Sequence, residues 1–441
     1  MSLRKAIKAL IPRGLFRLIE PYGHLVEAVI FNIIYGFPAR KLKVIGVTGT
    51  NGKTTTSFLI HRMLTEAGYK PGLMTTVAYG VGDDIKPQIA HMTTVSVPAL
   101  LKRIKQMKQD GMDWLVLETT SHALAQHRVW GIPYSIAVMT NITHEHLDYH
   151  GSFKRYREAK RKMFKMANHN WGGRRTGVIN ADDDSVNLFA KAIKDSVLYG
   201  VEHGELRARE IKSTPAGVSY IASIDGESYN IECHIPGSFN VYNSLAAVGV
   251  GRVLGLTKQQ IEQGIAALQS VEGRMARIDE GQAFEVIVDF AHTPDSFEKL
   301  FKDLKPNVTG KLVVLFGSAG RRDTAKRAVQ GELAGKYADE VILTEEDDRD
   351  EDGMKILDQI AEGAERAGKQ RQKDLFLIHD RTEAVKFAIS RAKAKDDVVL
   401  LLGKGHEKSI DGPDGERPWN EVETAKSALE GYINRKVVHK R

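Results

Sequence analysis

The residues with the clearest chemical meaning lie in Val44-Ile-Gly-Val-Thr-Gly-Thr-Asn-Gly-Lys-Thr-Thr-Thr56, where an apolar run enters a glycine-rich turn and then a helix. Backbone N–H groups in such a turn can surround a polyphosphate, and the helix start adds its positive dipole end. Lys53 can neutralise phosphate charge, and the Thr54 hydroxyl can hold Mg²⁺. The strict pattern G-x-x-x-x-G-K-[ST] is not met, because Val47 stands at its first glycine. The segment predicts a phosphate-binding loop, with a purely structural glycine turn as the alternative.

Two further segments could complete a site beside this loop. Leu115-Val-Leu-Glu118 ends an apolar run with a carboxylate, a suitable support for a metal next to a phosphate loop. The block Thr140 to Gly151 then places His144, His146 and His150 within seven residues. Zinc is one interpretation of this block. Since no cysteine is nearby and the loop implies Mg²⁺, we expect one histidine to complete a hard-cation site and the others to hold the loop.

The elements that must position these residues follow an alternating pattern. From Lys41 onward, apolar β-type runs alternate with helical stretches, which predicts a mostly parallel sheet covered by helices. Two later runs flank the turn Asp225-Gly226 and predict an antiparallel hairpin added to that sheet. The sequence therefore predicts an α/β, P-loop-type ATPase domain over residues 41–271. The predicted strands are Val44–Val47, Trp114–Leu117, Ile136–Met139 and Gly177–Asn180, with the hairpin strands Gly217–Ile224 and Ser228–His234.

A second alternating series follows Gly273 and predicts a Rossmann-like α/β domain over residues 272–441. The boundary between the two domains is expected near Val271, and no internal repeat marks the chain. The strands of this second domain are expected near Glu285–Val288, Leu312–Phe316, Glu340–Leu343, Leu375–Ile378 and Val398–Leu402.

Composition narrows the class of protein. A chain of 441 residues with 42% hydrophobic and 27% charged residues is ordinary globular material, long enough for two or three domains. Cys233 is the only cysteine, which excludes an internal disulfide and a cysteine-rich zinc site and favours a reducing cytoplasm. The net charge of +7 suggests a bias towards anionic substrates. No basic repeat with interleaved aromatics appears, so a nucleic-acid partner is not expected.

The first 40 residues form a separate basic and apolar segment. Arg4, Lys5, Lys8, Arg13 and Arg17 precede an apolar run around Leu25 to Phe37. The run contains Glu27 and is shorter than the roughly 20 residues that a membrane span needs. The basic part lacks the apolar core and cleavage site of a signal peptide. Two alternatives remain open: a helix packed on its own enzyme, or a segment that lies on an anionic membrane surface.

Nine ordered sequence blocks between residues 41 and 430 resemble those of a known family. Each block alone is only weakly specific for the family, but nine blocks in the same order are strongly specific. On these residues the chain resembles the Mur ligases, and among them most closely the MurE type. The blocks are Gly49 to Thr54; Glu118 to His122 with Gln126-His-Arg128; Asn141 to Gly151; Ala159-Lys160; Gly237 to Asn243; Glu272 to Met275; Val288 to Asp295; Gly317 to Asp323 with Lys326-Arg327; and Gly403 to Glu407.

The resemblance implies an ATP-dependent amide ligase of peptidoglycan and cell-wall synthesis. ATP would phosphorylate the terminal carboxylate of a nucleotide-linked muramyl peptide, and an incoming amino group would attack the acyl phosphate. Lys53, Glu118, His146 and Lys160 are the implied catalytic residues, with Lys160 carbamylated as in the family. Mg²⁺ would be held by Thr54, Glu118, His146 and Lys160. The implied ATP-binding residues are Gly49, Thr50, Asn51, Gly52, Lys53, Thr54, Thr55, Asn243, Arg274 and Asp289.

The resemblance also implies two substrate groups and a monomeric, cytoplasmic enzyme. Thr93, Thr94, Thr120, Ser121, Gln126 and Arg128 match positions for the muramyl peptide, and Arg327, Arg349, Gly403 and Glu407 match positions for the amino acid. The alternative for each group is a set of ordinary polar loop residues. Arg349 in particular lies in the acidic run Glu345 to Asp352, which by composition alone is a solvated loop.

Two features depart from the family pattern. The motif D-N-P-R, typical of enzymes that add meso-diaminopimelate, aligns with Glu346-Asp-Asp-Arg349. The added acidic residues favour an amino acid with a cationic side chain, whereas the retained Arg favours a distal carboxylate, so diaminopimelate and lysine both stay open. Second, MurE enzymes carry an N-terminal uridine-binding domain of about a hundred residues, whereas a short segment precedes the phosphate loop here. We therefore expect the UDP group to bind differently, or the acceptor to be lipid-linked.

Two other classes of protein compete with this interpretation. Folylpolyglutamate synthases share the chemistry and two of the domains, but Gln126-His-Arg128 and Gly403-Lys-Gly-His-Glu407 resemble Mur enzymes instead. A noncatalytic, nucleotide-gated binding module would leave Lys160, Arg274 and Asp289 without a role.

Overall fold

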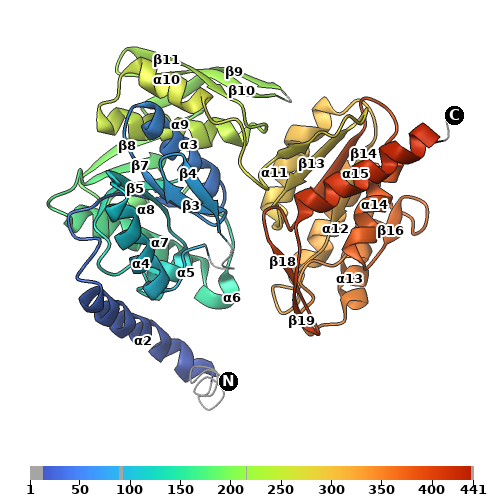
Figure 1. Cartoon of the computed structure of the whole chain (residues 1–441), viewed down its shortest axis with the longest axis horizontal. Helices are drawn as coiled ribbons and strands as arrows, with labels where there is room; N and C mark the ends of the chain where they lie inside the picture. The colour runs from blue at the N-terminus through green and yellow to red at the C-terminus, as the bar shows by residue number, and fades with distance from the viewer. Residues whose placement is uncertain (1–12, 89–92, 215, 439–441) are drawn as a thin grey trace. The chain divides into compact units, whose positions relative to one another are not determined.

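The computed structural model describes residues 13–88, 93–214 and 216–438, and the chain forms two compact units (Figure 1). Unit 1 contains Met1–Ile211, Ser219–Cys233 and Asn240–Leu268. Unit 2 contains Lys212–Val218, His234–Phe239 and Gln269–Arg441. After two shorter excursions into unit 2, the chain passes from unit 1 to unit 2 for the last time between Leu268 and Gln269. The predicted domain boundary near Val271 stays a prediction.

Unit 1 is built on an eleven-stranded sheet with the order β11-β10-β9-β8-β7-β6-β1-β5-β2-β3-β4 within the described residues. β1 pairs in parallel with β5 on one side and β6 on the other, so the phosphate loop leaves from the middle of the sheet. The strands are β1 Lys43–Thr48, β2 Gly72–Met74, β3 Ala78–Val81, β4 Asp84–Pro87, β5 Trp114–Glu118, β6 Tyr134–Met139, β7 Thr176–Asn180, β8 Asp195–Gly200, β9 Leu206–Thr214, β10 Gly217–Ile224 and β11 Glu227–Cys233.

Helices accompany this sheet because its central strands are apolar on both faces. Every residue of β5 and β6 is buried, and their side chains contribute to the main hydrophobic cluster of unit 1. The helices are α2 Arg13–Ile34, α3 Lys53–Glu66, α4 Val97–Gln109, α5 Ser121–Ala125, α6 Leu147–His150, α7 Phe153–His169, α8 Val186–Ala190, α9 Phe239–Leu254 and α10 Lys258–Ala266.

Unit 2 is a second α/β layer structure around a sheet of order β12-β13-β17-β14-β15-β16. The strands from β13 to β16 in that order are parallel, and two hydrophobic clusters of buried residues involve alternate residues of them. The elements are β12 Ala276–Ile278, β13 Glu285–Asp289, α11 Pro294–Leu304, η1 Lys305–Asn307, β14 Leu312–Phe316, α12 Ala325–Tyr337, β15 Glu340–Leu343, α13 Gly353–Arg366, β16 Leu375–Leu377, α14 Arg381–Arg391, β17 Val398–Leu402, β18 Ser409–Gly412, β19 Gly415–Pro418 and α15 Glu421–Val438.

The predicted fold class is confirmed. All nine predicted sheet strands outside the hairpin are present, most with bounds shifted by a residue or two. The predicted hairpin is also present as β10 and β11, which are neighbours in the sheet. Its turn residues Asp225 and Gly226 both have positive φ angles, 50° and 77°, as a two-residue hairpin turn with the twist of the strands requires.

The described part of the N-terminal segment contains the helix α2, whose Ala28 and Asn32 are buried, whereas Arg4, Lys5 and Lys8 lie outside the described residues. Asn32 Nδ2 lies 3.4 Å from the carbonyl oxygen of Trp130. Among the described residues, no helix is long and apolar enough to span a membrane.

Candidate active site

The phosphate loop is a strand-turn-helix connection whose shape depends on two glycines. Gly52 has φ 81° and caps the start of α3, and Gly49 has φ 153°. A Cβ atom on Gly49 would clash with Thr140 Oγ1, and one on Gly52 would clash with Asn243 Oδ1. Only glycine fits both positions without displacing a neighbour. The loop therefore keeps its backbone close to the two polar side chains that flank it.

The segment after β6 holds this loop through its backbone. The N–H of Asn51 donates to Asn141 Oδ1 at 2.9 Å, and Asn141 Nδ2 donates to the carbonyl of Asn51 at 3.1 Å. Thr140 Oγ1 donates to the same carbonyl at 2.6 Å, and the N–H of Thr143 donates to Thr50 Oγ1 at 2.9 Å. These contacts fix the loop before any ligand binds, which is the condition for a preorganised phosphate site.

The polar side chains at the start of α3 are oriented towards the site. Lys53 Nζ donates to the carbonyls of Gly49, at 3.1 Å, and Thr50, at 2.6 Å. Thr54 Oγ1 donates to Glu118 Oε2 at 3.0 Å, and Glu118 is 1% exposed at the end of β5. A hydroxyl and a carboxylate in contact are hard oxygen donors, the ligand set that Mg²⁺ prefers. The neighbouring Thr55 is also buried, in the first turn of α3.

Lys160 lies beneath the same loop. Its side chain on α7 is 2% exposed, and its Nζ donates to the carbonyl of Gly49, which Lys53 also contacts. Burial lowers the pKa of the Lys160 amine well below its usual value, and the positive charge of Lys53 lowers it further. Glu145 and Glu118 oppose this shift in the pKa. The shift of the pKa therefore increases the share of the neutral amine at this position.

Tyr156 is part of this cluster, although its role was not predicted from the sequence. Its hydroxyl is 2.9 Å from Thr50 Oγ1, and its ring centroid is 5.4 Å from that of His150 and 4.7 Å from Lys160 Nζ. Tyr156 and Lys160 are four residues apart on α7, so helical spacing puts them on one face. That spacing was a usable signal, since Tyr156 lies one helical turn before the predicted Lys160.

Among the described residues, the histidine block does not bring three potential ligand atoms close enough to share a metal ion, although the rings of His146 and His150 both contact that of His122. His146 has a left-handed backbone, φ 56°, and its ring packs against that of His122 with centroids 4.7 Å apart. Its Nε2 is 3.7 Å from Glu145 Oε2. His144 stacks on Phe153, and His150 Nε2 is 3.0 Å from Ser121 Oγ. The assignment of His146 to a metal stays a prediction.

Asn243, a predicted ATP contact, lies beside the loop on α9. It is 3% exposed, its Nδ2 donates to Asn240 Oδ1 at 2.7 Å, and Thr56 Oγ1 donates to its Oδ1 at 3.4 Å. The structure thus brings Asn243 together with the predicted loop residues around Gly52.

The residues predicted for the muramyl peptide gather next to Glu118. Thr94 Oγ1 donates to the carbonyl of Glu118 at 3.3 Å and accepts from the N–H of Thr120 at 3.1 Å. Arg128 is buried, donates to the carbonyl of Thr94, and donates through Nε to Gln126 Oε1 at 2.9 Å. Burial lowers the pKa of its guanidinium. Thr93 accepts from Thr76 Oγ1 at 2.9 Å, and Ser121 contacts His150, so all six predicted residues border one region.

In unit 2, the predicted ATP residues Arg274 and Asp289 are neighbours at the end of β13. The Asp289 carboxylate accepts from the N–H groups of Met275 and Ala291, each at 2.8 Å. Loss of hydration raises the pKa of Asp289, and the nearby Arg274 opposes that rise. The Arg274 guanidinium lies 4.6 Å from the centroid of the Phe290 ring.

Arg327 and Arg349 approach the same loop of unit 2 from two elements. Arg327, 1% exposed on α12, donates to the carbonyl of Ala319 at 3.2 Å and to Glu351 Oε2 at 2.9 Å. Arg349 has a left-handed backbone, φ 56°, and its Nη1 donates to the carbonyl of Gly320. The two guanidinium groups thus contact adjacent carbonyls, and each also has a carboxylate nearby, Glu351 for Arg327 and Asp411 for Arg349.

The acidic run is largely buried, so its interpretation as a solvated loop is wrong for Glu345, Glu346 and Asp348. Lys404 compensates part of its charge, with Nζ 2.9 Å from Asp347 Oδ1 and 2.6 Å from Glu407 Oε2. Burial raises the pKa of Glu407, and Lys404 opposes the rise. Glu346 Oε2 is buried without a hydrogen-bond partner and lies close to Gly403, which has φ 98°.

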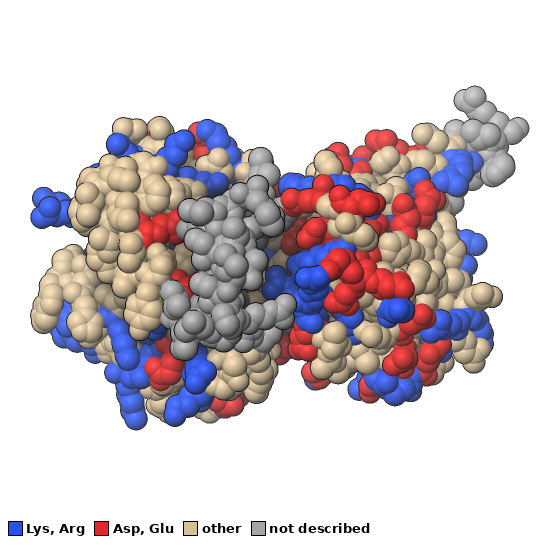
Figure 2. Space-filling view, turned by 90° about the horizontal axis from the view of Figure 1, so that it is seen from below, with Lys and Arg blue, Asp and Glu red and all other residues tan. Residues whose placement is uncertain are grey.

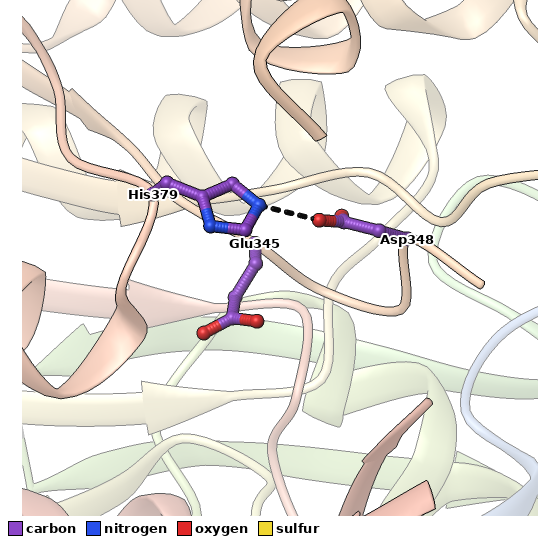
Figure 3. A group of neighbouring side chains, drawn as sticks. All are labelled: Glu345, Asp348 and His379. Carbon is purple, nitrogen blue, oxygen red and sulfur yellow. Dashed lines mark hydrogen bonds and ion pairs between the residues drawn. The ribbon is translucent and has the colours of Figure 1, made fainter. Parts of the chain in front are cut away.

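Figure 3 shows a second acidic group in the same run, formed by Glu345, Asp348 and His379. Their ligand atoms lie within 4.8 Å of one another, and His379 Nε2 is 2.6 Å from Asp348 Oδ2. The Glu345 carboxylate instead turns away from that pair in Figure 3 and accepts from Arg417 and from the N–H of Arg381. Ion pairing and backbone contacts therefore account for these three side chains.

Fold and geometry together define a class: a P-loop enzyme with a buried lysine at its phosphate loop and a second α/β unit that carries paired arginines. Comparison of the sequence with models of known protein families identifies that class. The Mur ligase middle domain matches residues 47–251, and the Mur ligase glutamate ligase domain matches residues 273–405. The chain belongs to the Mur ligase family, so it is an ATP-dependent amide ligase.

Relatives that are named for particular ligase activities within this family are similar to this chain over most of its length. A UDP-N-acetylmuramyl-tripeptide synthetase of Roseiflexus sp. is 39% identical over 421 residues, 93% of this chain and 82% of the relative. A UDP-N-acetylmuramoyl-L-alanyl-D-glutamate--2,6-diaminopimelate ligase of Caldanaerobacter subterraneus is 37% identical over 404 residues, 91% of this chain and 81% of the relative. The chain is therefore a MurE-type member of the family.

Solved structures agree with this assignment. A structure of a UDP-N-acetylmuramoyl-L-alanyl-D-glutamate--2,6-diaminopimelate ligase matches with a TM-score of 0.61 and 30% identity, over 90% of this chain and 80% of that one. A Mycobacterium tuberculosis folylpolyglutamate synthase complexed with ADP matches with a TM-score of 0.69 but 17% identity, over 86% of this chain and 91% of that one. This second likeness concerns the fold alone.

Proposed function

We propose that this enzyme adds a diamino acid, diaminopimelate or lysine, to a muramyl-peptide carboxylate at the expense of ATP. The observation that carries the proposal is the cluster at the phosphate loop, where Lys53 and the buried Lys160 both contact the Gly49 carbonyl. Thr54 and Glu118 stand in contact beside them. Such a cluster can hold a polyphosphate, neutralise its charge and place a carboxylate acceptor next to it.

In this proposal the chain's own residues bind, neutralise and orient. The loop N–H groups and Lys53 bind the phosphates, and Lys53 stabilises the charge that develops during phosphoryl transfer to the acceptor carboxylate. Asn243 borders the loop, while Arg274 and Asp289 are the ATP contacts proposed from unit 2. Arg128 and the threonines around Thr94 orient the muramyl peptide, whose activated acyl group is then attacked by the incoming amine.

The residues present fit Mg²⁺. Thr54 and Glu118 offer oxygen donors that already touch, and His146 is retained as a further proposed ligand. Bound Mg²⁺ would supply positive charge next to the transferred phosphoryl group. A carbamate on Lys160 would add one more anionic oxygen, and the lowered pKa of Lys160 supports the neutral amine that carbamylation requires.

The amino-acid site is proposed in unit 2. Arg327 and Arg349 would bind carboxylate groups, because an Arg fork matches carboxylate geometry. Glu346, which lies close to Gly403, would bind ammonium groups together with Glu407 and Asp347, the two carboxylates that Lys404 contacts in the structure. Diaminopimelate has two carboxylates and two amines, and lysine has one carboxylate and two amines. Paired arginines next to an acidic cluster therefore match the charged groups of diaminopimelate more completely than those of lysine.

The proposal is tested by phosphate release from ATP with purified enzyme and a matrix of acceptors and amino acids. UDP-muramyl dipeptide, its lipid-linked counterpart and a folate serve as acceptors, each with diaminopimelate, lysine or glutamate. Phosphate release that requires a muramyl acceptor and a diamino acid supports the proposal. Turnover with folate and glutamate, or nucleotide binding without turnover under every condition, would overturn it.

The domain boundaries, oligomeric state and location of the enzyme are also proposed. We propose residues 41–271 and 272–441 as the central and C-terminal domains, and a monomer in the cytoplasm whose N-terminal segment, residues 1–40, contacts a membrane peripherally. A single buried cysteine, Cys233, suits a reducing compartment.

A further inference from the structure

The helix α2 presents an apolar stripe that the described residues of unit 1 leave exposed. Tyr22, Val26, Ile30, Ile33 and Ile34 are between 47% and 68% exposed, and their spacing places them along one side of the helix. The stripe continues to Phe37, just after the helix. Large apolar side chains are individually common on surfaces, but a contiguous helical stripe marks an interaction site.

The opposite side of α2 is the one that packs on the enzyme. Ala28 and Asn32, one helical turn apart, are both buried, and Asn32 lies next to Trp130 and Gly131. The polar residues Glu20 and Glu27 are half-buried, and Glu27 pairs with His24 at 3.0 Å. Both alternatives expected for this segment therefore concern the same helix: one side packs internally, and the other side is available.

In the sequence, basic residues precede and follow the stripe. The first 19 residues of the sequence contain Arg4, Lys5, Lys8, Arg13 and Arg17 and no Asp or Glu. At the other end, Arg40, Lys41 and Lys43 are exposed. The acidic residues of α2 lie outside the stripe and are partly covered. An apolar stripe flanked by cations at both ends is complementary to an anionic lipid surface, where cations meet headgroups and apolar side chains enter the acyl boundary.

The same charges argue against a second copy of the chain as the partner. By sequence, residues 1–43 contain eight Lys or Arg and two Glu, so two copies of this segment side by side, parallel or antiparallel, would each bring an excess of positive charge. Either arrangement opposes like charges. Figure 2, seen from below, shows tan areas on unit 1 together with both blue and red side chains.

We propose that the exposed stripe of α2 docks the enzyme on an anionic lipid bilayer, with the helix lying in the plane of the interface. The stripe from Tyr22 to Ile34 is about 18 Å long at 1.5 Å per residue, which suits shallow insertion along the surface. This inference extends the membrane contact included above and does not depend on the ligase reaction.

The experiment is co-sedimentation of the full chain with phosphatidylcholine vesicles, with and without phosphatidylglycerol. We expect binding to the anionic vesicles that weakens with added salt, and little binding to the neutral ones. The double variant Ile30→Asp, Ile33→Asp should lose about tenfold or more in vesicle affinity, because two inserted apolar side chains become charged. The matched control Val329→Asp, Met354→Asp alters two exposed apolar residues of unit 2 and should bind like the wild type.

A second variant keeps the inference falsifiable if the first one is poorly folded. Arg40→Gln with Lys41→Gln leaves the stripe intact and should weaken binding to anionic vesicles by roughly tenfold, with a shallower salt dependence. Equal binding to neutral and anionic vesicles, or no vesicle binding together with an α2-dependent dimer in sedimentation velocity, would overturn the proposal. Because no substrate is present in these assays, their failure is distinguishable from failure of the proposed reaction.

Discussion

The phosphate loop of unit 1 and the acidic cluster of unit 2 are built in opposite ways. The loop is shaped by backbone geometry: Gly49 and Gly52 permit close approach, and Thr140 and Asn141 fix the chain by hydrogen bonds to Asn51. The acidic cluster is instead held largely by ion pairs, among them those of Lys404 with both Asp347 and Glu407. The comparison indicates that the loop is held in place before a ligand arrives, whereas an amino acid that binds at the cluster, as proposed, would have to replace internal ion pairs.

This difference has an energetic consequence. A preorganised loop loses little conformational freedom when phosphate binds, so its contacts are available to stabilise the transition state. In the acidic cluster, part of the attraction for a cationic substrate is offset by the Lys404 contacts that must be broken. We therefore expect substitutions at the loop to change the rate of turnover and those at the cluster to change substrate selection.

The largest effect is expected for Lys53→Ala. The variant should lose on the order of a thousandfold or more in kcat, because Lys53 would stabilise the transferring phosphoryl group rather than the fold. Steady-state phosphate release gives the rate, and thermal unfolding is expected to be close to that of the wild type. Near-normal turnover would mean that the loop is not the catalytic phosphate site. It would also contradict the expectation that substitutions at the loop change the rate of turnover.

Lys160→Ala tests whether the buried lysine works as a carbamate. The variant should be nearly inactive, because it removes the oxygen donor proposed for Mg²⁺, and short carboxylates added to the buffer should restore part of the activity. Intact-mass measurement of the wild type under bicarbonate should show the added carbamate. The Lys160→Arg variant keeps a cation and should resist rescue. Full activity in Lys160→Ala, or rescue of Lys160→Arg to the same level, would contradict the carbamate.

The phosphate loop was predictable from sequence because its determinants are contiguous. Gly49 to Thr54 lies between an apolar run and a helix, and the structure keeps that order. Lys160 is more than 100 residues away, yet its block placed it in the site, whereas the contact of Tyr156 with Thr50 needed the helix α7 to be seen. A strand-turn-helix motif fixes its own local geometry, but it does not name the distant side chains that pack beneath it.

The acidic cluster was less predictable for a physical reason. Glu345, Glu346 and Asp348 look like a solvated run because the compensating groups come from elsewhere: Arg417 and the N–H of Arg381 contact Glu345, and His379 contacts Asp348. Burial of a charge depends on such partners, and partners separated by thirty or more residues leave no local pattern. Apolar strands such as β14 and β17, by contrast, were predicted with their observed bounds, since burial of apolar runs requires no specific partner.

Arg349→Ala should have an intermediate effect that falls on amino-acid binding. Loss of a carboxylate-binding Arg from a desolvated site typically costs about 2–5 kcal/mol, so the KM for the amino acid should rise far more than that for ATP. Arg349 also donates to the Gly320 carbonyl, so Arg349→Lys is the control: it keeps the charge but loses the fork geometry. Unchanged selectivity in both variants would show that the alignment across the acidic run is wrong.

The smallest expected effect comes from Asp347→Asn, which restores the amide of the family motif at that position. Asp347 accepts from Lys404 Nζ at 2.9 Å and from the N–H of Asp411 at 3.0 Å, and an amide oxygen can keep one of these contacts but not the charge. With one negative charge fewer, Lys404 pairs more strongly with Glu407, so the cluster attracts a cationic side chain less. We expect kcat/KM for lysine to fall by about tenfold or less, near 1 kcal/mol, with a smaller change for diaminopimelate.

Competition between the two amino acids in one reaction, analysed by product mass, directly measures the ratio of kcat/KM for lysine to kcat/KM for diaminopimelate. The variant Asp414→Asn in the β18–β19 turn serves as an exposed control. A ratio that moves equally in both variants, or towards lysine in Asp347→Asn, would show that ion pairing in this cluster does not set amino-acid selection.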